Sequence, residues 1–344
     1  MNTIEKYRKS VVLWLFFVAA MVIAMIFVGG LTRLTQSGLS MVEWRPLMGT
    51  IPPISEQDWL DVFEKYKAYP EYQKLNKGMS MDEFKFIFAF EYGHRVLGRV
   101  IGLVFALPAL FFILKGAVPR SLIPKLVLLF LLGGAQGVIG WWMVKSGLVD
   151  RPDVSHYRLT THLGMAVSLY IALLWIAFSH WKAVDAKSNF QSVPGHGFAK
   201  ILLGMVFLVL LSGGLVAGLN AGHQFNTFPL MAGHLIPPGL FSIDPWYMNF
   251  FENMLTLQFN HRYFAILTAS LVIGFWFYMK KRIVTSSQRL ALNTMLAAVL
   301  LQVSLGITTL LTVVWVPVAS MHQMGAIFLL SALIWVNTEL STVE

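Results

Sequence analysis

The sequence has the length and composition of a polytopic membrane protein. Its 344 residues are 56% hydrophobic and only 12% charged, whereas about a quarter of the residues in soluble globular domains are charged. A transmembrane helix needs about 20 apolar residues, so roughly eight spans and some loop fit into this length. Cysteine is absent, which excludes thiol catalysis, cysteine-ligated iron–sulfur clusters and disulfide-stapled loops.

Apolar runs predict eight membrane-spanning helices. They lie near residues 11–32, 93–114, 122–144, 160–180, 198–219, 262–279, 290–313 and 317–337. The first run is too long for the core of a signal peptide, so we expect it to remain as a span. An even number of spans puts both termini on the same side of the membrane.

The distribution of charge predicts which side that is. Loops and ends on the side of the termini hold 13 basic and 4 acidic residues, a net charge of +9, and the other side holds 13 of each sign. Positive charge accumulates on cytoplasmic loops, so we expect cytoplasmic termini. With no Arg- and Ser-rich transit peptide, a bacterial cytoplasmic membrane is favoured over the mitochondrial inner membrane. The basic residues are spread over short turns, which argues against a nucleic-acid partner.

The two halves of the chain look like a repeated four-helix unit. The matched pairs, in chain order, are Gly29-Gly30-Leu31 with Gly213-Gly214-Leu215, His94-Arg95 with His261-Arg262, Gln136 and Gly140 with Gln302 and Gly306, and His162 with His322. Four is an even number, so both units have the same orientation. We therefore predict an all-α integral membrane fold of two pseudo-symmetric four-helix bundles, residues 1–185 and 186–344.

The outer loop over residues 33–92 is too long for a simple connection, so we expect it to be structured or functional. Ser55 and Asp58 begin one helical pattern, whose apolar residues share a face; these are Trp59, Val62, Phe63 and Tyr66. Ser80 and Glu83 have capping-box spacing for a second helix that can run into the next span. The first helix is either a lid on the membrane surface or a helix packed within the loop.

Four of the nine histidines occupy corresponding places in the two halves. These are His94, His162, His261 and His322, and each lies near the outer end of an even-numbered span. Two parallel helices in each half can then aim one imidazole each at a common centre, as heme iron with two axial ligands requires. The alternative for any one of them is a structural histidine or a proton relay. Zinc is disfavoured because neither pair has the further ligands that zinc needs.

Basic residues accompany these histidines. Arg95, Arg99 and Arg262 lie at the same outer helix ends. Guanidinium groups there can pair with heme propionates in bidentate fashion. The alternative is that they only snorkel to the membrane boundary.

An ionisable group distinguishes the two halves. Glu91 stands three residues before His94, whereas Gln258 stands three residues before His261. We expect partial desolvation to raise the proton affinity of Glu91, which would suit it to proton transfer at the edge of a porphyrin. The alternative is a boundary carboxylate that is solvated or paired with Arg95.

The sequence resembles the heme A synthase family over nearly its whole length. The resemblance rests on GGLTRLTQSGLSMVEWRPLMGTIPP at 29–53, YKAYPEYQKLN at 66–76, Glu-x-x-His-Arg at 91–95 with Gly98-Arg99, and NTFPLM at 226–231. It implies that His94 and His162 bind the substrate heme, with Glu91 essential for catalysis, and that His261 and His322 hold heme b. Some members carry cysteine pairs in their outer loops, and this chain has none.

The reaction implied by the resemblance oxidises one ring methyl of heme O to a formyl group, giving heme A for cytochrome oxidase assembly. We expect water to supply oxygen, Glu91 to take protons, and heme b to pass electrons to a membrane acceptor such as quinone. The expected partners are heme O, the lipid bilayer and heme O synthase. The histidines alone would equally suit a diheme b-type electron-transfer protein, and the repeat would also suit a secondary transporter.

Overall fold

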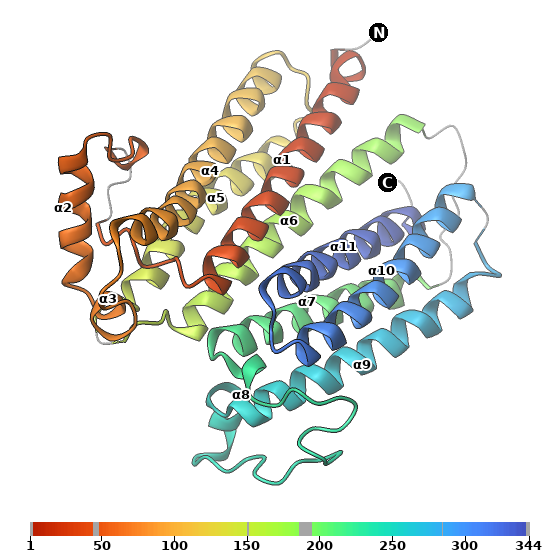
Figure 1. The fold of residues 1–344 in the computed structure, drawn as a ribbon. Coiled ribbons are helices and arrows are strands. Elements are labelled where there is room, and N and C mark those ends of the chain that lie inside the picture. The colour runs from red at the N-terminus through yellow and green to blue at the C-terminus, as the bar shows by residue number, and fades with distance from the viewer. Residues whose placement is uncertain (1–2, 44–47, 150, 186–194, 284, 342–344) are drawn as a thin grey trace.

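The computed structural model of the chain describes residues 3–43, 48–149, 151–185, 195–283 and 285–341, and the regular secondary structure in those ranges is helical (Figure 1). Eight helices there are long and apolar enough to cross a membrane, as predicted. They are α1 (Thr3–Leu34), α4 (Met81–Leu114), α5 (Ile123–Lys145), α6 (His156–Asp185), α7 (His196–Gly218), α9 (Met254–Met279), α10 (Ser286–Leu311) and α11 (Val316–Leu340). Shorter helices α2 (Glu56–Lys67), α3 (Pro70–Lys74) and α8 (Asn249–Glu252) lie in the loops.

The long helices make the same ring of contacts in both halves. In the first half, α1 and α5 each pack against both α4 and α6; in the second, α7 and α10 each pack against both α9 and α11. This pattern is consistent with a repeat of two four-helix bundles. The two sets meet where α1 and α6 contact α7 and α11 (Figure 1). The predicted boundary between residues 185 and 186 adjoins 186–194, which lie outside the described residues.

Small side chains let the two halves approach closely. A Cβ at Gly218 of α7 would lie 2.5 Å from the Cβ of His156 on α6, and one at Gly214 would lie 3.2 Å from the Oγ1 of Thr160. A hydrogen bond joins α11 to α1: Gln323 Nε2 donates to the backbone carbonyl oxygen of Ile26 at 2.9 Å. Close packing and interhelical hydrogen bonds are what hold helices together in lipid, where apolar burial between helices gains little.

The outer loop is anchored by two capped helices. Ser55 caps α2 and Ser80 caps α4, each with a capping box; the box at Ser80 was predicted, and at Ser55 only the helix start was. Helix α4 continues from this cap to Leu114, so the second expected helix does run into the span. The apolar face of α2 is buried against α4, with the rings of Phe63 and Phe84 stacked at 4.8 Å between centroids. Helix α2 is therefore packed within the loop, and its placement as a lid on the membrane surface stays a prediction.

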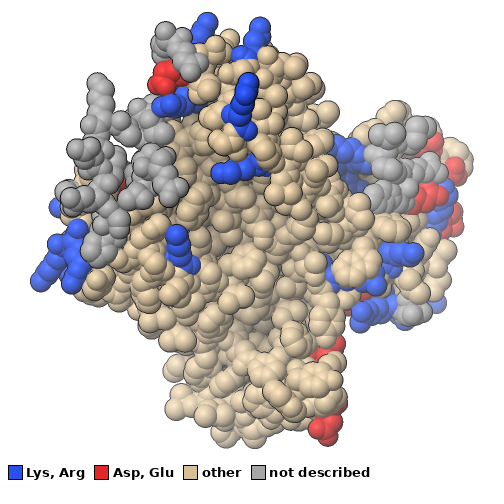
Figure 2. Space-filling view, turned by 180° about the vertical axis from the view of Figure 1, so that it is seen from behind, with Lys and Arg blue, Asp and Glu red and all other residues tan. Residues whose placement is uncertain are grey.

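Charge is segregated along the molecule. Both termini lie at the same end of the long helices (Figure 1). Figure 2 shows mainly basic side chains at that end of the visible face, a largely uncharged band across its middle, and both basic and acidic side chains on the projecting part at the right of the view. Four residues of the charge count, Arg45, Asp150, Lys187 and Glu344, lie outside the described residues.

Candidate functional site

The four repeated histidines lie on α4, α6, α9 and α11. His162, His261 and His322 fall in the second turn of their helices. His94 falls in the fourth turn of α4, because this helix begins at Met81, well before the predicted span. All four histidines are half-buried within the spans.

The histidine-bearing helices face each other across each bundle. Helices α1 and α5 lie between α4 and α6, and α7 and α10 lie between α9 and α11. His94 interacts electrostatically with His162, and His261 with His322. Two imidazoles on opposite helices, with two other helices at the sides, make the donor set of a bis-histidine heme site.

Each imidazole packs against a glycine of an intervening helix. A Cβ at Gly29, Gly140, Gly213 or Gly306 would come within 3.1, 3.1, 3.2 or 2.9 Å of the ring of His94, His162, His261 or His322, respectively. These four glycines are among the residues that the sequence repeat matched. A side chain at any of these four positions would push against the histidine ring, so glycine is needed there for space and not for backbone conformation.

The donor set suits heme better than a bare ion. Among the described residues, no group of three or more His, Cys, Asp or Glu side chains is placed to hold a metal. Heme brings four ring nitrogens of its own and asks the protein only for axial ligands. One histidine pair in each half therefore fits one heme.

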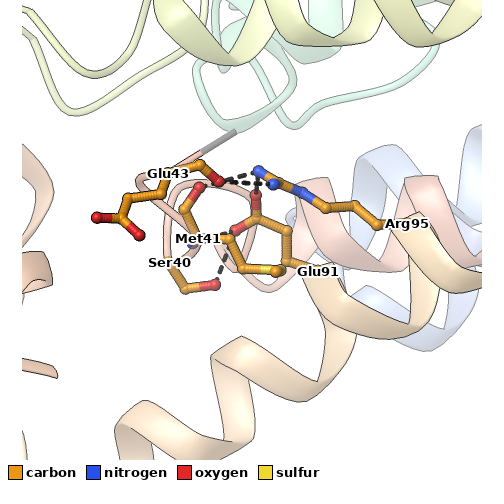
Figure 3. Close-up of polar contacts among 5 residues, drawn as sticks. All are labelled: Ser40, Met41, Glu43, Glu91 and Arg95. Carbon is orange, nitrogen blue, oxygen red and sulfur yellow. Dashed lines mark hydrogen bonds and ion pairs between the residues drawn. The ribbon is translucent and has the colours of Figure 1, made fainter. Parts of the chain in front are cut away.

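Glu91 is buried at the junction of α4 and the outer loop (Figure 3). It is 3% exposed, so it is not a solvated boundary residue. Its Oε2 accepts hydrogen bonds from Ser40 Oγ at 2.7 Å and from the Met41 amide at 2.8 Å, and its Oε1 accepts one from Arg95 at 2.6 Å. Three hydrogen-bond donors therefore surround this buried carboxyl group. The predicted alternative of pairing with Arg95 is thus present, in addition to a tie to the loop.

The guanidinium of Arg95 also binds the loop. It donates to the carbonyl oxygens of Met41 at 2.9 Å and Glu43 at 3.3 Å (Figure 3). The loop that follows α1 is therefore fastened to α4 by an arginine and a carboxylate one helical turn apart. The sequence reasoning expected propionates as the partners of Arg95 and did not foresee these loop contacts.

Arg262 makes the equivalent contacts in the second half. It donates to the carbonyl oxygens of Phe225 and of Thr227, the latter at 2.7 Å, and to Gln258 Oε1 at 3.2 Å. Phe225 and Thr227 stand 184 residues after Met41 and Glu43, the same offset that separates Gly213 from Gly29. The repeat therefore includes the loop after the first helix of each half. Propionate binding by Arg95, Arg99 and Arg262 stays a prediction.

Comparison with known proteins identifies the family. The chain matches the COX15-CtaA family, described as cytochrome oxidase assembly protein, over residues 12–334. The heme A synthase of Nitrosospira multiformis is 52% identical over 336 residues, covering 97% of this chain and 94% of that protein. The heme A synthase of Nitrosomonas eutropha is 48% identical over 343 residues, covering 98% and 96%. This chain is a member of the heme A synthase family. The resemblance inferred from its motifs is confirmed.

One motif of this heme A synthase family member holds a buried acid that the sequence reasoning missed. Glu71, in the 66–76 motif, is 3% exposed and accepts a hydrogen bond from the Tyr66 hydroxyl at 2.9 Å. Asn76 Nδ2 in turn donates to that hydroxyl at 2.7 Å. Burial raises the pKa of Glu71 to about 8. The single carboxylate in a motif with three tyrosines was the signal that could have found it.

Two further polar residues contact histidine rings in the second half. Ser212 Oγ lies 2.7 Å from His261 Nδ1, and the Gln302 amide lies 3.1 Å from His322 Nδ1. The sequence reasoning matched Gln302 to Gln136 but gave it no role, and it did not single out Ser212. The signal for Ser212 was its position directly before the repeated Gly213.

Proposed function

We propose that this chain is an oxidoreductase that converts heme O to heme A. The observation that carries the proposal is the difference between Glu91 and Gln258 in an otherwise repeated bis-histidine scaffold of the heme A synthase family. A plain diheme electron carrier has no need of an ionisable group beside only one of its hemes. An enzyme that removes hydrogen from a ring methyl needs a proton acceptor there.

The N-terminal half is proposed to bind the substrate. His94 and His162 would ligate the iron of heme O. The product, heme A, would then leave this site. His261 and His322 would hold heme b as a resident cofactor, whose iron exchanges electrons when bound. Glu91 lies on the same face of α4 as His94, one turn away, so its carboxylate belongs to the N-terminal site.

Oxidation of the methyl group consumes one water and gives a formyl group, four protons and four electrons. It proceeds through hydroxylation and loss of water. Glu91 accepts protons as the methyl is oxidised. The electrons pass by way of the C-terminal half to a membrane acceptor of the quinone class, and heme O synthase supplies the substrate.

The test replaces Glu91 with Gln and compares it with Ser40→Ala. Both changes remove a hydrogen bond between α4 and the outer loop, but only Glu91→Gln removes the titratable group. We expect Glu91→Gln to lower heme A formation by about 10²-fold or more, while heme content stays near that of the Ser40→Ala variant. Heme A is measured by extraction and mass analysis of membranes. Continued heme A formation in Glu91→Gln would show that Glu91 is not the proton acceptor. Absence of heme A from cells that have only the unmodified protein as a source would instead favour an electron carrier.

The membrane orientation is also proposed. The apolar helices and the bacterial relatives indicate a bacterial membrane protein. We propose that its termini are cytoplasmic and that its histidine pairs lie toward the periplasm. Because the chain has no cysteine, Leu235→Cys and Lys281→Cys can be labelled singly in intact cells with an impermeant maleimide. Labelling at 235 but not at 281 is expected, and the reverse would invert the orientation.

A further inference from the structure

The ring of His261 is held in one tautomer by Ser212. The Ser212 hydroxyl donates its only proton to the carbonyl oxygen of Val209 at 2.7 Å. At 2.7 Å from His261 Nδ1, the same oxygen can then only accept. The proton of the imidazole is therefore on Nδ1, which leaves the lone pair of Nε2 free to bind iron.

The ring of His322 has an equivalent partner in Gln302. The amide of Gln302 lies 3.1 Å from His322 Nδ1, and its Oε1 is buried without a hydrogen-bond partner. Amide oxygen and nitrogen are exchanged by turning the group over. In the turned orientation the oxygen would accept the Nδ1 proton, and His322 would then also present Nε2 to a heme iron.

The first half lacks both of these partners. Val28 directly precedes Gly29, as Ser212 precedes Gly213, and its side chain has no hydrogen-bonding group. Gln136 matches Gln302, but its Nε2 donates to the backbone carbonyl of His162 at 3.0 Å. In the part of the chain that the structure describes, His162 Nδ1 is buried with no hydrogen-bond partner.

We propose that Ser212 and Gln302 are positioning residues that make the C-terminal half retain its heme, while the absence of such partners lets the N-terminal half exchange heme. The proposal rests on the proposed function, which assigns a resident heme to one half and a transient one to the other. Hydrogen bonds to the second nitrogen of a ligating histidine fix its orientation and increase its basicity, and losing them costs about 10–100-fold in metal affinity.

The test measures heme loss from the purified full-length protein to excess apomyoglobin. We expect heme b to leave Ser212→Ala and Gln302→Leu about 10–100-fold faster than it leaves the unmodified protein. Ser212→Thr keeps a hydroxyl and should restore slow loss. Val28→Ala removes similar bulk at the equivalent position and should leave heme b loss unchanged.

The midpoint potential of heme b separates positioning from simple structural support. A less basic ligand stabilises ferric iron less, so Ser212→Ala should shift the redox equilibrium toward the reduced form by roughly tenfold, or about 59 mV for one electron. Ser212→Thr should return it. Unchanged heme loss and potential in both Ser212→Ala and Gln302→Leu would overturn this inference alone. A purified protein without heme b would overturn the proposed function itself.

Discussion

Near their outer ends, α4 and α9 bind the loop of their own half through equivalent residues, and these residues differ in one charge. On α4, Arg95 and Glu91 fasten the loop after α1; on α9, Arg262 and Gln258 fasten the loop after α7. Gln258 is as deeply buried as Glu91. Its Nε2 donates to the backbone carbonyl oxygen of Ala221, in the loop after α7, at 3.2 Å. Fastening the loop therefore does not require a carboxylate. Because the loop contacts do not need the charge of Glu91, we propose that this carboxylate serves as the proton acceptor of the reaction.

The histidine environments differ in the opposite sense. The second half has the more complete set of hydrogen bonds around its imidazoles, and the first half has the ionisable group. A resident cofactor gains from ligands locked in place, whereas a substrate must arrive and leave. The same fold can serve both needs because its helices fix the ligands and the neighbouring side chains set how firmly they are held.

The largest expected effect is on heme content, and it tests whether the two halves bind independently. His261→Ala should abolish heme b binding and leave heme O or heme A in place, because the two histidine pairs lie in separate helix rings. His94→Ala should do the reverse. Heme extraction and mass analysis of purified variants measures both. Loss of both hemes from either variant would show that the halves do not act as separate sites.

A smaller effect is expected on the stability of the outer loops. It tests whether Arg95 and Arg262, which donate to loop carbonyl oxygens, have equivalent roles. Arg95→Ala should destabilise the segment at 37–43, and Arg262→Ala the segment at 221–227, each by about 1.5–3 kcal/mol for loss of charged hydrogen bonds. Arg95→Ala should have the larger effect, because it also leaves the buried Glu91 without its cation. Hydrogen exchange of the backbone amides measures the change. Normal exchange with loss of heme would favour propionates as the main partners instead.

The smallest effect concerns pH and is confined to the outer loop of the first half. Burial raises the pKa of Glu71 from its ordinary 4.5 to about 8, so the folded loop binds a proton that the unfolded chain releases above about pH 4.5. The resulting stabilisation is complete below that pH and is lost as the pH rises through about 8. Glu71→Gln keeps an acceptor for Tyr66 and should flatten this dependence. Thermal unfolding of both proteins on either side of pH 8 provides the measurement, and equal slopes would contradict the prediction.

Much of the architecture was predictable from the sequence because lipid imposes simple rules. Spans must be long and apolar, so eight of them could be recognised, and Ser55 and the capping-box spacing at Ser80 marked two helix starts. The spans that were predicted to begin at 93 and 262 begin at Met81 and Met254. Polar side chains inside both helices, such as Glu91 and Gln258, interrupt the apolar pattern and hide the start of the helix from a search for apolar runs.

The sequence by itself determined the eight spans, the repeat and the four candidate iron ligands, because periodicity, composition and matched spacing are properties of the chain alone. Only the tertiary structure decided which atoms those residues meet. It placed glycines against all four imidazoles and directed Arg95 and Arg262 to loop carbonyls. Within the described residues, it also gave side-chain hydrogen-bond partners to Nδ1 of His261 and His322. Such contacts depend on distances of tenths of an ångström between helices far apart in sequence, and no local pattern encodes them.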